Sequence, residues 1–133
     1  MSEQSNVDVT RKIYDAFSRG DIAGILSLLD PQADLVFEGS PTIPWTGTWR
    51  QREGWTNFFQ AVGTNMDDVK LAMEPFAAQG DKVVAAGRYQ ARVKATGKAI
   101  DSPLVHLWTI KNGLVIRCQE MTNTAAEAAA CQA

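Results

Sequence analysis

Residues 104–124, LVHLWTIKNGLVIRCQEMTNT, constrain the fold of this chain more than any other stretch. Two runs rich in Val, Ile, Leu, Thr and Trp flank the tripeptide Lys-Asn-Gly at 111–113. Such runs on either side of a tight turn are typical of a β-hairpin. The hairpin carries the only histidine of the chain, His106, on one arm and a carboxylate, Glu120, on the other. It therefore predicts both a sheet and a place for acid–base chemistry.

The length of the turn decides whether the imidazole and the carboxylate share a face, because side chains alternate between faces with a period of two. A two-residue Asn-Gly turn would place His106 opposite Gln119 and direct Glu120 to the other face. A three-residue Lys-Asn-Gly turn, with its glycine as a left-handed bulge, would place Glu120 opposite Leu104, on the same face as His106. We predict the three-residue turn.

The length and composition of the chain indicate one ordinary globular domain over residues 1–133, with its core over about residues 7–124 and an alanine-rich tail over 125–133. Of the 133 residues, 45% are hydrophobic and 21% are charged, and the net charge is −2. This charge gives no electrostatic reason to expect a nucleic-acid or membrane partner. The N-terminus lacks a signal-peptide pattern, and no apolar run approaches the roughly 18 residues of a membrane span. The two cysteines form no disulfide framework, so we expect a reduced, cytoplasmic protein.

The first half of the chain predicts three helices and one short strand. Apolar residues at helical spacing indicate a helix over residues 7–19, a second from an Asp21 N-cap to Pro31, and a third over 50–62. A short strand is expected over 33–38. The loop that follows is rich in Pro and Gly and contains Trp45; its aromatic residues either pack on the core or line a pocket.

The second half predicts four long strands joined by tight turns, over residues 69–78, 82–95, 99–110 and 114–124. The alanine-rich tail could add a helical turn or fray. Helices followed by a run of strands indicate an α+β domain in which a mostly antiparallel sheet curls over the helices.

Three segments in this order resemble the SnoaL-like branch of the nuclear transport factor two superfamily: IYDAFSRGDIAGILSLLDPQADLVFEG, GTWRQREGWTNFF and VHLWTIKNGLVIR. The resemblance covers residues 7–124. It implies a cone-shaped α+β fold, in which a strongly curved, mostly antiparallel sheet wraps three helices around a deep apolar pocket. It also implies a homodimer built through the sheet and a site that needs no cofactor.

The superfamily includes polyketide cyclases, ketosteroid isomerases and limonene epoxide hydrolases. In the cyclases, a histidine seven residues before the hairpin glycine and an acidic residue seven after it serve the active site. His106 and Glu120 stand at these spacings from Gly113, although the family has Asp where this chain has Glu. The epoxide hydrolases use an Asp-Arg-Asp set, and here Arg88 and Glu120 fall near two of its places. Gln90 stands at the other carboxylate place, so that water activation lacks an acceptor.

The ketosteroid isomerases fit least well. Their tyrosine, base and oxyanion-hole positions fall at Ile13, Phe37 and His106, and none of these matches. Tyr14 is one residue away from the tyrosine position, a rotation of about 100° on a helix.

Two interpretations of the polar pair remain open. A lone Glu in a sheet is usually solvated, and a buried His is usually structural, but His is also the side chain that exchanges a proton near neutral pH. One His without clustered Cys, Asp or Glu argues against a metal site. Arg88 alternates with Gln90 and Arg92 on one strand face, which is more often a solvated face than an anion site.

We therefore predict a small cofactor-independent protein that binds a hydrophobic or aromatic small molecule. If it is catalytic, His106 and Glu120 serve as acid and base for proton abstraction next to a carbonyl, as in isomerisation or aldol-type cyclisation. The alternative is a non-catalytic ligand-binding or dimerisation module whose polar pair is structural. The candidate pocket-lining residues are Tyr14, Phe37, Trp45, Trp49, Arg88, Trp108 and Asn123.

Overall fold

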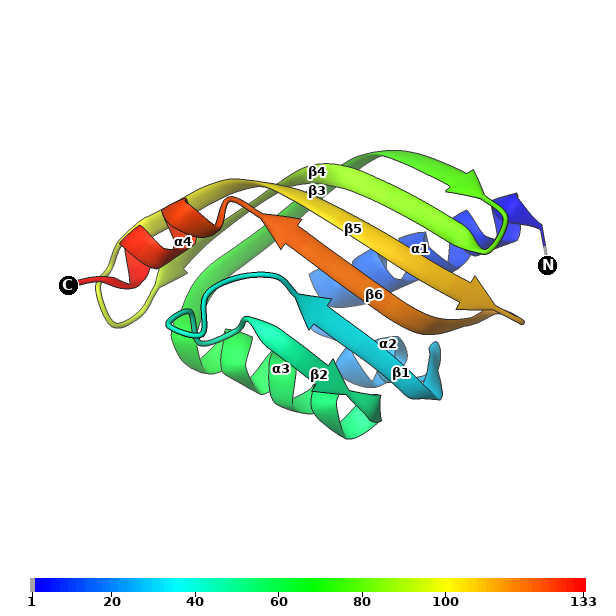
Figure 1. Cartoon of the computed structure of the whole chain (residues 1–133), viewed down its shortest axis with the longest axis horizontal. Helices are drawn as coiled ribbons and strands as arrows, with labels where there is room; N and C mark the ends of the chain where they lie inside the picture. Colours follow the sequence, from blue (N-terminus) through cyan, green and yellow to red (C-terminus); the bar gives the residue numbers. More distant parts are fainter. Residues whose placement is uncertain (1) are drawn as a thin grey trace.

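The computed structural model describes residues 2–133, which form four helices and six strands (Figure 1). The helices are α1 (Glu3–Ser18), α2 (Ile22–Leu26), α3 (Gln51–Asn65) and α4 (Thr124–Cys131). The strands are β1 (Leu29–Phe37), β2 (Gly47–Arg50), β3 (Met66–Gln79), β4 (Lys82–Val93), β5 (Ala99–Lys111) and β6 (Leu114–Thr122). The predicted α+β class is confirmed, and β2 and α4 are added to the expected elements.

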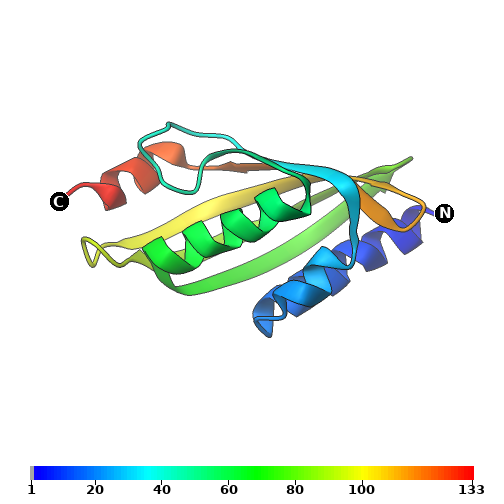
Figure 2. The same ribbon diagram turned by 90° about the horizontal axis from the view of Figure 1, so that it is seen from below.

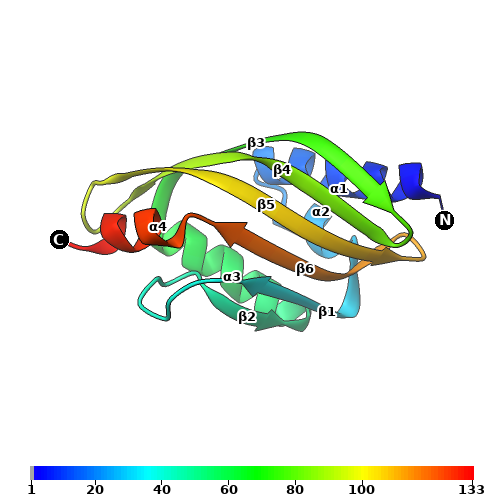
Figure 3. The same cartoon turned by 45° about the horizontal axis from the view of Figure 1, so that its top comes forward.

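The strands form one mixed sheet in the order β2-β1-β6-β5-β4-β3 (Figure 3). β1 runs parallel to β6, and every other neighbouring pair is antiparallel. The sheet is curled but not closed, and α1, α2 and α3 lie on one side of it (Figure 2). α1 packs against β3 and β4, and α3 packs against β1 and β2. This confirms the expected arrangement of a curved, mostly antiparallel sheet around three helices.

α1 begins earlier than the predicted residue 7, because Ser2 provides an N-cap. The Ser2 side chain accepts a hydrogen bond from the backbone N–H of Ser5 at 3.0 Å. The predicted apolar stripe is confirmed, since Val9 and Ile13 are buried against the sheet. This stripe fixes the rotation of α1 and so directs the neighbouring Tyr14 toward the interior.

α2 is shorter than predicted, because it ends at Leu26 and not at the proline. Pro31 lies inside β1, where the pairing with β6 is interrupted between Leu29 and Asp34. A proline has no N–H to donate to a sheet and is tolerated at such an irregularity. The chain therefore enters the sheet sooner than the helix-ending role of Pro31 suggested.

The loop predicted over 39–48 runs directly into β2, which pairs antiparallel with the end of β1. β2 has 4 residues, which is too short for a recognisable alternation. α3 follows at once, and its Trp55 is buried with its indole N–H donated to the carbonyl of Ala33 at 3.1 Å. This bond ties α3 to β1 and fixes one wall of the interior.

The turn of the β5–β6 hairpin corrects our prediction. Lys111 pairs with Leu114, so the turn consists of two residues, Asn112 and Gly113. Both have positive φ, 53° and 78°, which is the type I′ geometry that an Asn-Gly pair favours in hairpins. The predicted three-residue turn is wrong, because Asn112 takes the left-handed conformation that we had assigned to the glycine alone.

A bulge in β6 then changes the register. Ile110 pairs with Val115, but Thr109 pairs with Arg117, so one residue of β6 has no partner on β5. Beyond the bulge His106 stands directly opposite Glu120. Directly opposite residues of an antiparallel pair point to the same face, so the two side chains meet in spite of the two-residue turn.

The alanine-rich tail forms α4, which ends at Cys131. Asn123 is its N-cap, and the side chain accepts a hydrogen bond from the backbone N–H of Ala126 at 3.1 Å. The helix packs on β5 and buries Glu127 and Ala130. Within residues 2–133, no helix is both long and apolar enough to cross a membrane.

Candidate functional site

A cavity lies between the helices and the concave face of the sheet. The centre of a water molecule can occupy a volume of about 70 Å³ inside it. Its lining is apolar and largely aromatic. The polar groups in the lining are the hydroxyls of Tyr14 and Tyr89, the imidazole of His106 and the carboxylate of Glu120. Cavities of this kind, apolar with a few convergent polar groups, are the usual sites of small-molecule ligands.

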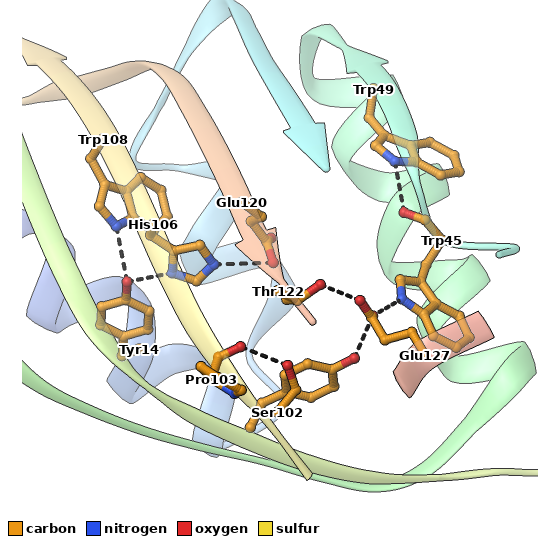
Figure 4. A network of polar contacts seen from close by, with 11 residues as sticks. Tyr14, Trp45, Trp49, Ser102, Pro103, His106, Trp108, Glu120, Thr122 and Glu127 are labelled. Atoms are coloured by element: carbon orange, nitrogen blue, oxygen red, sulfur yellow. Dashed lines mark hydrogen bonds and ion pairs between the residues drawn. The ribbon is translucent and has the colours of Figure 1, made fainter. Parts of the chain in front are cut away.

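His106 and Glu120 form the polar centre of this cavity (Figure 4). The Nε2 atom of His106 lies 3.1 Å from Oε2 of Glu120, and their side chains are 5% and 12% exposed. β5 and β6 position them because the two residues are register partners. An imidazole and a carboxylate at this distance can exchange a proton or act on the same ligand.

The contact between these two groups is close but poorly directed. Nε2 of His106 has no partner in hydrogen-bond geometry, although the carboxylate oxygen is near. Among residues 2–133 only one other buried side-chain atom, Oδ1 of Asn6, lacks a partner. Buried polar groups are nearly always hydrogen-bonded, so an unpaired one beside a cavity has a donor or acceptor to offer to a ligand.

The other nitrogen of His106 is held by a tyrosine from α1. The hydroxyl oxygen of Tyr14 lies 2.5 Å from Nδ1, and the indole N–H of Trp108 donates to the same oxygen at 2.9 Å. An indole N–H can only donate, so the hydroxyl proton is available to Nδ1. This arrangement favours the tautomer of neutral His106 that carries its proton on Nε2, toward Glu120 and the cavity. Burial raises the pKa of Tyr14, which keeps this hydroxyl protonated.

Aromatic packing fixes this chain of groups in place. The rings of Tyr14 and His106 lie nearly parallel, with centroids 5.5 Å apart and an interplanar angle of 15°. Trp108 meets Tyr14 edge-on at 5.9 Å and stacks against Trp55 of α3 at 6.4 Å. Offset and edge-on contacts of this kind stabilise a fixed ring geometry. The imidazole is thus oriented by elements from both halves of the chain.

Six of the nine predicted site residues line the cavity: Tyr14, Phe37, Trp45, His106, Trp108 and Glu120. Phe37 comes from β1, whose parallel pairing with β6 places it beside Glu120. Trp45 comes from the loop before β2 and is fully buried. The sheet and this loop therefore bring together residues that are far apart in the sequence.

The other three predicted pocket residues lie outside the cavity lining, and these predictions are corrected. Arg88 is exposed on the outer face of β4, where its guanidinium pairs with Asp101 at 3.0 Å. Asn123 is an exposed helix cap. Trp49 packs edge-on against the Phe58 ring, with centroids 5.7 Å apart, and does not line the cavity. Strand alternation explains Arg88, because its neighbour Tyr89 takes the inward position.

Two polar side chains of the interior, Tyr89 and Glu127, were not among the predicted site residues. Glu127 is completely buried, and Tyr89, Trp45 and Thr122 all donate hydrogen bonds to its carboxylate. Burial, followed by the charge of Glu127, raises the pKa of Tyr89, so its hydroxyl remains a donor. The one available signal was a single acidic residue in a run of alanines directly after a helix cap.

No group of three or more His, Cys, Asp or Glu side chains within residues 2–133 is arranged to hold a metal ion. The polar groups of the cavity are thus one imidazole, one carboxylate and hydroxyls that already have partners. Such a set can bind and move protons by itself.

Comparisons with known proteins agree with this fold. Residues 10–118 match the SnoaL-like domain. An NTF2-like protein of unknown function from Burkholderia pseudomallei superposes with a TM-score of 0.91 at 25% identity, over 100% of both chains. An NTF2-like protein from Burkholderia xenovorans gives 0.89 at 27% identity, over 99% of each chain. TerC, crystallised with polyporic acid, gives 0.88 at 27% identity, over 97% of this chain and 99% of TerC. The chain belongs to the SnoaL-like domain family.

Proposed function

We propose that the protein is a cofactor-independent acid–base enzyme that acts on a small, largely aromatic carbonyl compound. The reaction is removal of a proton from the carbon next to the carbonyl group, as in isomerisation or aldol-type ring closure. One observation carries the proposal. His106 Nε2 and Glu120 Oε2 lie 3.1 Å apart beside an aromatic cavity, and Nε2 has no directed hydrogen bond.

In this mechanism Glu120 is the base. Its carboxylate takes the proton from carbon, and the electron pair of the broken C–H bond moves into the carbonyl group to give an enolate. The N–H at Nε2 of His106 stabilises the charge that develops on the enolate oxygen. Glu120 then returns the proton to another carbon in an isomerisation. In a ring closure, the enolate carbon forms a bond to the carbon of a second carbonyl group, and the proton held by Glu120 passes to the alkoxide oxygen that results. Tyr14 holds His106 in the required tautomer throughout.

The size of the cavity bears on the ligand. About 70 Å³ is room for a few water molecules, which is less than most aromatic ligands need. A larger hollow of about 490 Å³ lies between α1 and β3 and shares Tyr14, Phe17, Val69 and Leu71 with the cavity. A ligand that reacts at Glu120 therefore extends past Tyr14 into this hollow, or the shared side chains move aside. The co-crystallisation of TerC with polyporic acid supports a small organic ligand for this fold.

A test need not identify the natural substrate. Solvent deuterium exchange at the carbon next to the carbonyl of simple aryl ketones, followed by NMR, reports the proposed step directly. Glu120→Gln keeps the shape of the side chain but cannot take the proton, so we expect exchange to fall by about 10²–10⁴-fold. Glu53→Gln makes the same change on an exposed face of α3 and serves as the matched control. Full exchange by Glu120→Gln refutes the role of Glu120 as base.

We also propose that the protein is cytoplasmic and that it forms a homodimer through the outer face of the sheet. Val84 and Met121, which are 40% and 37% exposed, are the exposed large apolar side chains of residues 2–133. Register pairs with β5 join them into one patch through Leu107 and Val105. Arginine and aspartate side chains, Arg88 and Asp101, stand together at one end of it. A second copy related by a two-fold axis fits such a patch, because it offers the same apolar surface and both signs of charge.

A further inference from the structure

The buried carboxylate of Glu127 is held by donors from three different elements. The indole N–H of Trp45 donates to Oε2 at 2.7 Å, and the hydroxyl of Tyr89 donates to the same oxygen. The hydroxyl of Thr122 donates to Oε1. Glu127 is 0% exposed, and no Lys, Arg or His side chain of residues 2–133 forms an ion pair with it. Hydrogen bonds alone therefore satisfy this carboxylate, which lies in the N-terminal half of α4.

Two of these three donors are walls of the cavity. Trp45 lies in the loop before β2, and Tyr89 lies on β4, at the far side of the sheet order from β1. Both side chains line the cavity, and both donate their polar hydrogen to the carboxylate of Glu127 on α4. Figure 4 shows the indole nitrogen of Trp45 directed toward Glu127. A single carboxylate thus accepts hydrogen bonds from two aromatic side chains that lie far apart in the sequence.

We propose that Glu127 is a positioning residue of the cavity, and that α4 is part of the binding site. By accepting from Trp45 and Tyr89, the carboxylate sets the two ring planes. It also keeps the Tyr89 hydroxyl out of the cavity, so that this end of the site selects an apolar, aromatic part of the ligand. The claim that the cavity binds such a ligand rests on the proposed function; the claim that Glu127 orients the two rings does not.

The chemistry of the cluster predicts which substitutions preserve it. In Glu127→Ala the indole N–H and the Tyr89 hydroxyl lose a buried acceptor and must turn toward the cavity or toward water. In Glu127→Gln the amide oxygen can accept from Trp45 and Tyr89, and the amide nitrogen can donate to the Thr122 oxygen. Alanine should therefore disorder the two rings, and glutamine should preserve them.

The first measurement is the indole N–H spectrum of the ¹⁵N-labelled protein, in which the four tryptophans give separate signals. The Trp45 signal, assigned with Trp45→Phe, should be shifted downfield by its bond to a carboxylate. It should keep a hydrogen-bonded position in Glu127→Gln and lose it in Glu127→Ala. An unshifted Trp45 signal in folded Glu127→Ala overturns the proposal.

The second measurement is the affinity for phenol, a small aromatic probe. Freeing two ring side chains that must be ordered again on binding should weaken phenol binding by about tenfold in Glu127→Ala, and Glu127→Gln should restore most of it. Because glutamine fills the same volume as glutamate, Tyr89→Phe, which leaves residue 127 unchanged, separates the lost hydrogen bond from a loss of packing. If the alanine variant does not fold, Tyr89→Phe decides: it keeps the carboxylate and the ring but removes one bond, and unchanged phenol binding in it overturns the proposal.

The proposals for Glu127 and for catalysis fail separately. If Glu120→Gln retains full deuterium exchange, the proposed reaction fails, while the Trp45 signal still reports on Glu127. If exchange requires Glu120 but the Trp45 signal and the affinity for phenol are unchanged in Glu127→Ala, the proposed function stands and the positioning role does not. Even where phenol binds the wild type too weakly to measure, the indole signal alone decides whether Glu127 orients Trp45.

Discussion

Tyr14→Phe is the substitution whose consequences follow most directly from the site. It removes one oxygen atom, which stands 2.5 Å from Nδ1 of His106 and 2.9 Å from the indole nitrogen of Trp108. The ring and its contacts with His106 and Trp108 remain. Two buried groups, one acceptor and one donor, then lose their shared partner. At about 1–3 kcal/mol for each group left unsatisfied, and with some relaxation, we expect a loss of about 2–4 kcal/mol in the free energy of unfolding.

The same substitution should change the protonation of His106. Without the tyrosine hydroxyl, Nδ1 has no donor, and the imidazole is free to place its proton on Nδ1 instead of Nε2. The donor that faces the ligand is then lost in part of the population. We expect deuterium exchange of an aryl ketone to fall by about 10–100-fold, less than for loss of the base itself. Urea denaturation measures the first effect, and long-range ¹H–¹⁵N NMR of His106 measures the tautomer.

Tyr89→Phe is the matched control, because it removes a buried hydroxyl that bonds to Glu127 and not to His106. It should destabilise the protein without changing the tautomer of His106. A Tyr14→Phe protein that loses less than about 0.5 kcal/mol and keeps the proton on Nε2 would refute the relay from Trp108 through Tyr14 to His106.

Three further predictions concern the whole fold. Trp55→Ala should lower the free energy of unfolding by about 3–5 kcal/mol, because this buried indole also bonds to Ala33; a loss under about 1 kcal/mol in chemical denaturation would contradict its place in the core. Burial raises the folded-state pKa of Tyr14 and Tyr89 above 10.0, so the unfolded chain loses these protons first. The free energy of unfolding should therefore fall as the pH rises above about 10, and Tyr89→Phe should make this fall less steep. A free energy of unfolding that does not change over this pH range would contradict the raised pKa of the two tyrosines. Light scattering at micromolar concentration should give a dimer mass, and Val84→Lys should give a monomer; a monomeric wild type would exclude the interface.

The elements with strong local patterns could be predicted from the sequence. The apolar stripe through Val9 and Ile13 predicted α1, and the four long strands were expected close to their observed bounds. The elements that were missed have weak local patterns. β2 is too short to show alternation, and α4 lies in a run of alanines that looks the same whether it is packed or frayed. Tertiary contacts determine that α4 packs on the sheet, because the hydrogen-bond donors to Glu127 come from residues that are far away in the sequence.

Pocket residues on strands could be predicted only where the alternation of inward and outward side chains was assigned correctly. On β4 the outward set that includes Arg88 was recognised as a solvated face, yet Arg88 was placed in the pocket because a related enzyme class has an arginine near there. Its exposure and its pair with Asp101 show that this alternation was the better guide. The same alternation places Tyr89 on the opposite face from Arg88, but nothing local indicates that a carboxylate from the last helix accepts a hydrogen bond from its hydroxyl.

The position of Glu120 shows how the alternation of side chains along one strand can be broken by a single extra residue. In β6, Val115 and Cys118 are both fully buried, although residues three apart on a regular strand point to opposite faces. Two inward residues at an odd spacing, with the exposed Arg117 between them, require one extra residue in the strand. That bulge, and not a longer turn, brings Glu120 opposite His106. The two-residue Asn-Gly turn and the bulge in β6 together set the register that assembles the site.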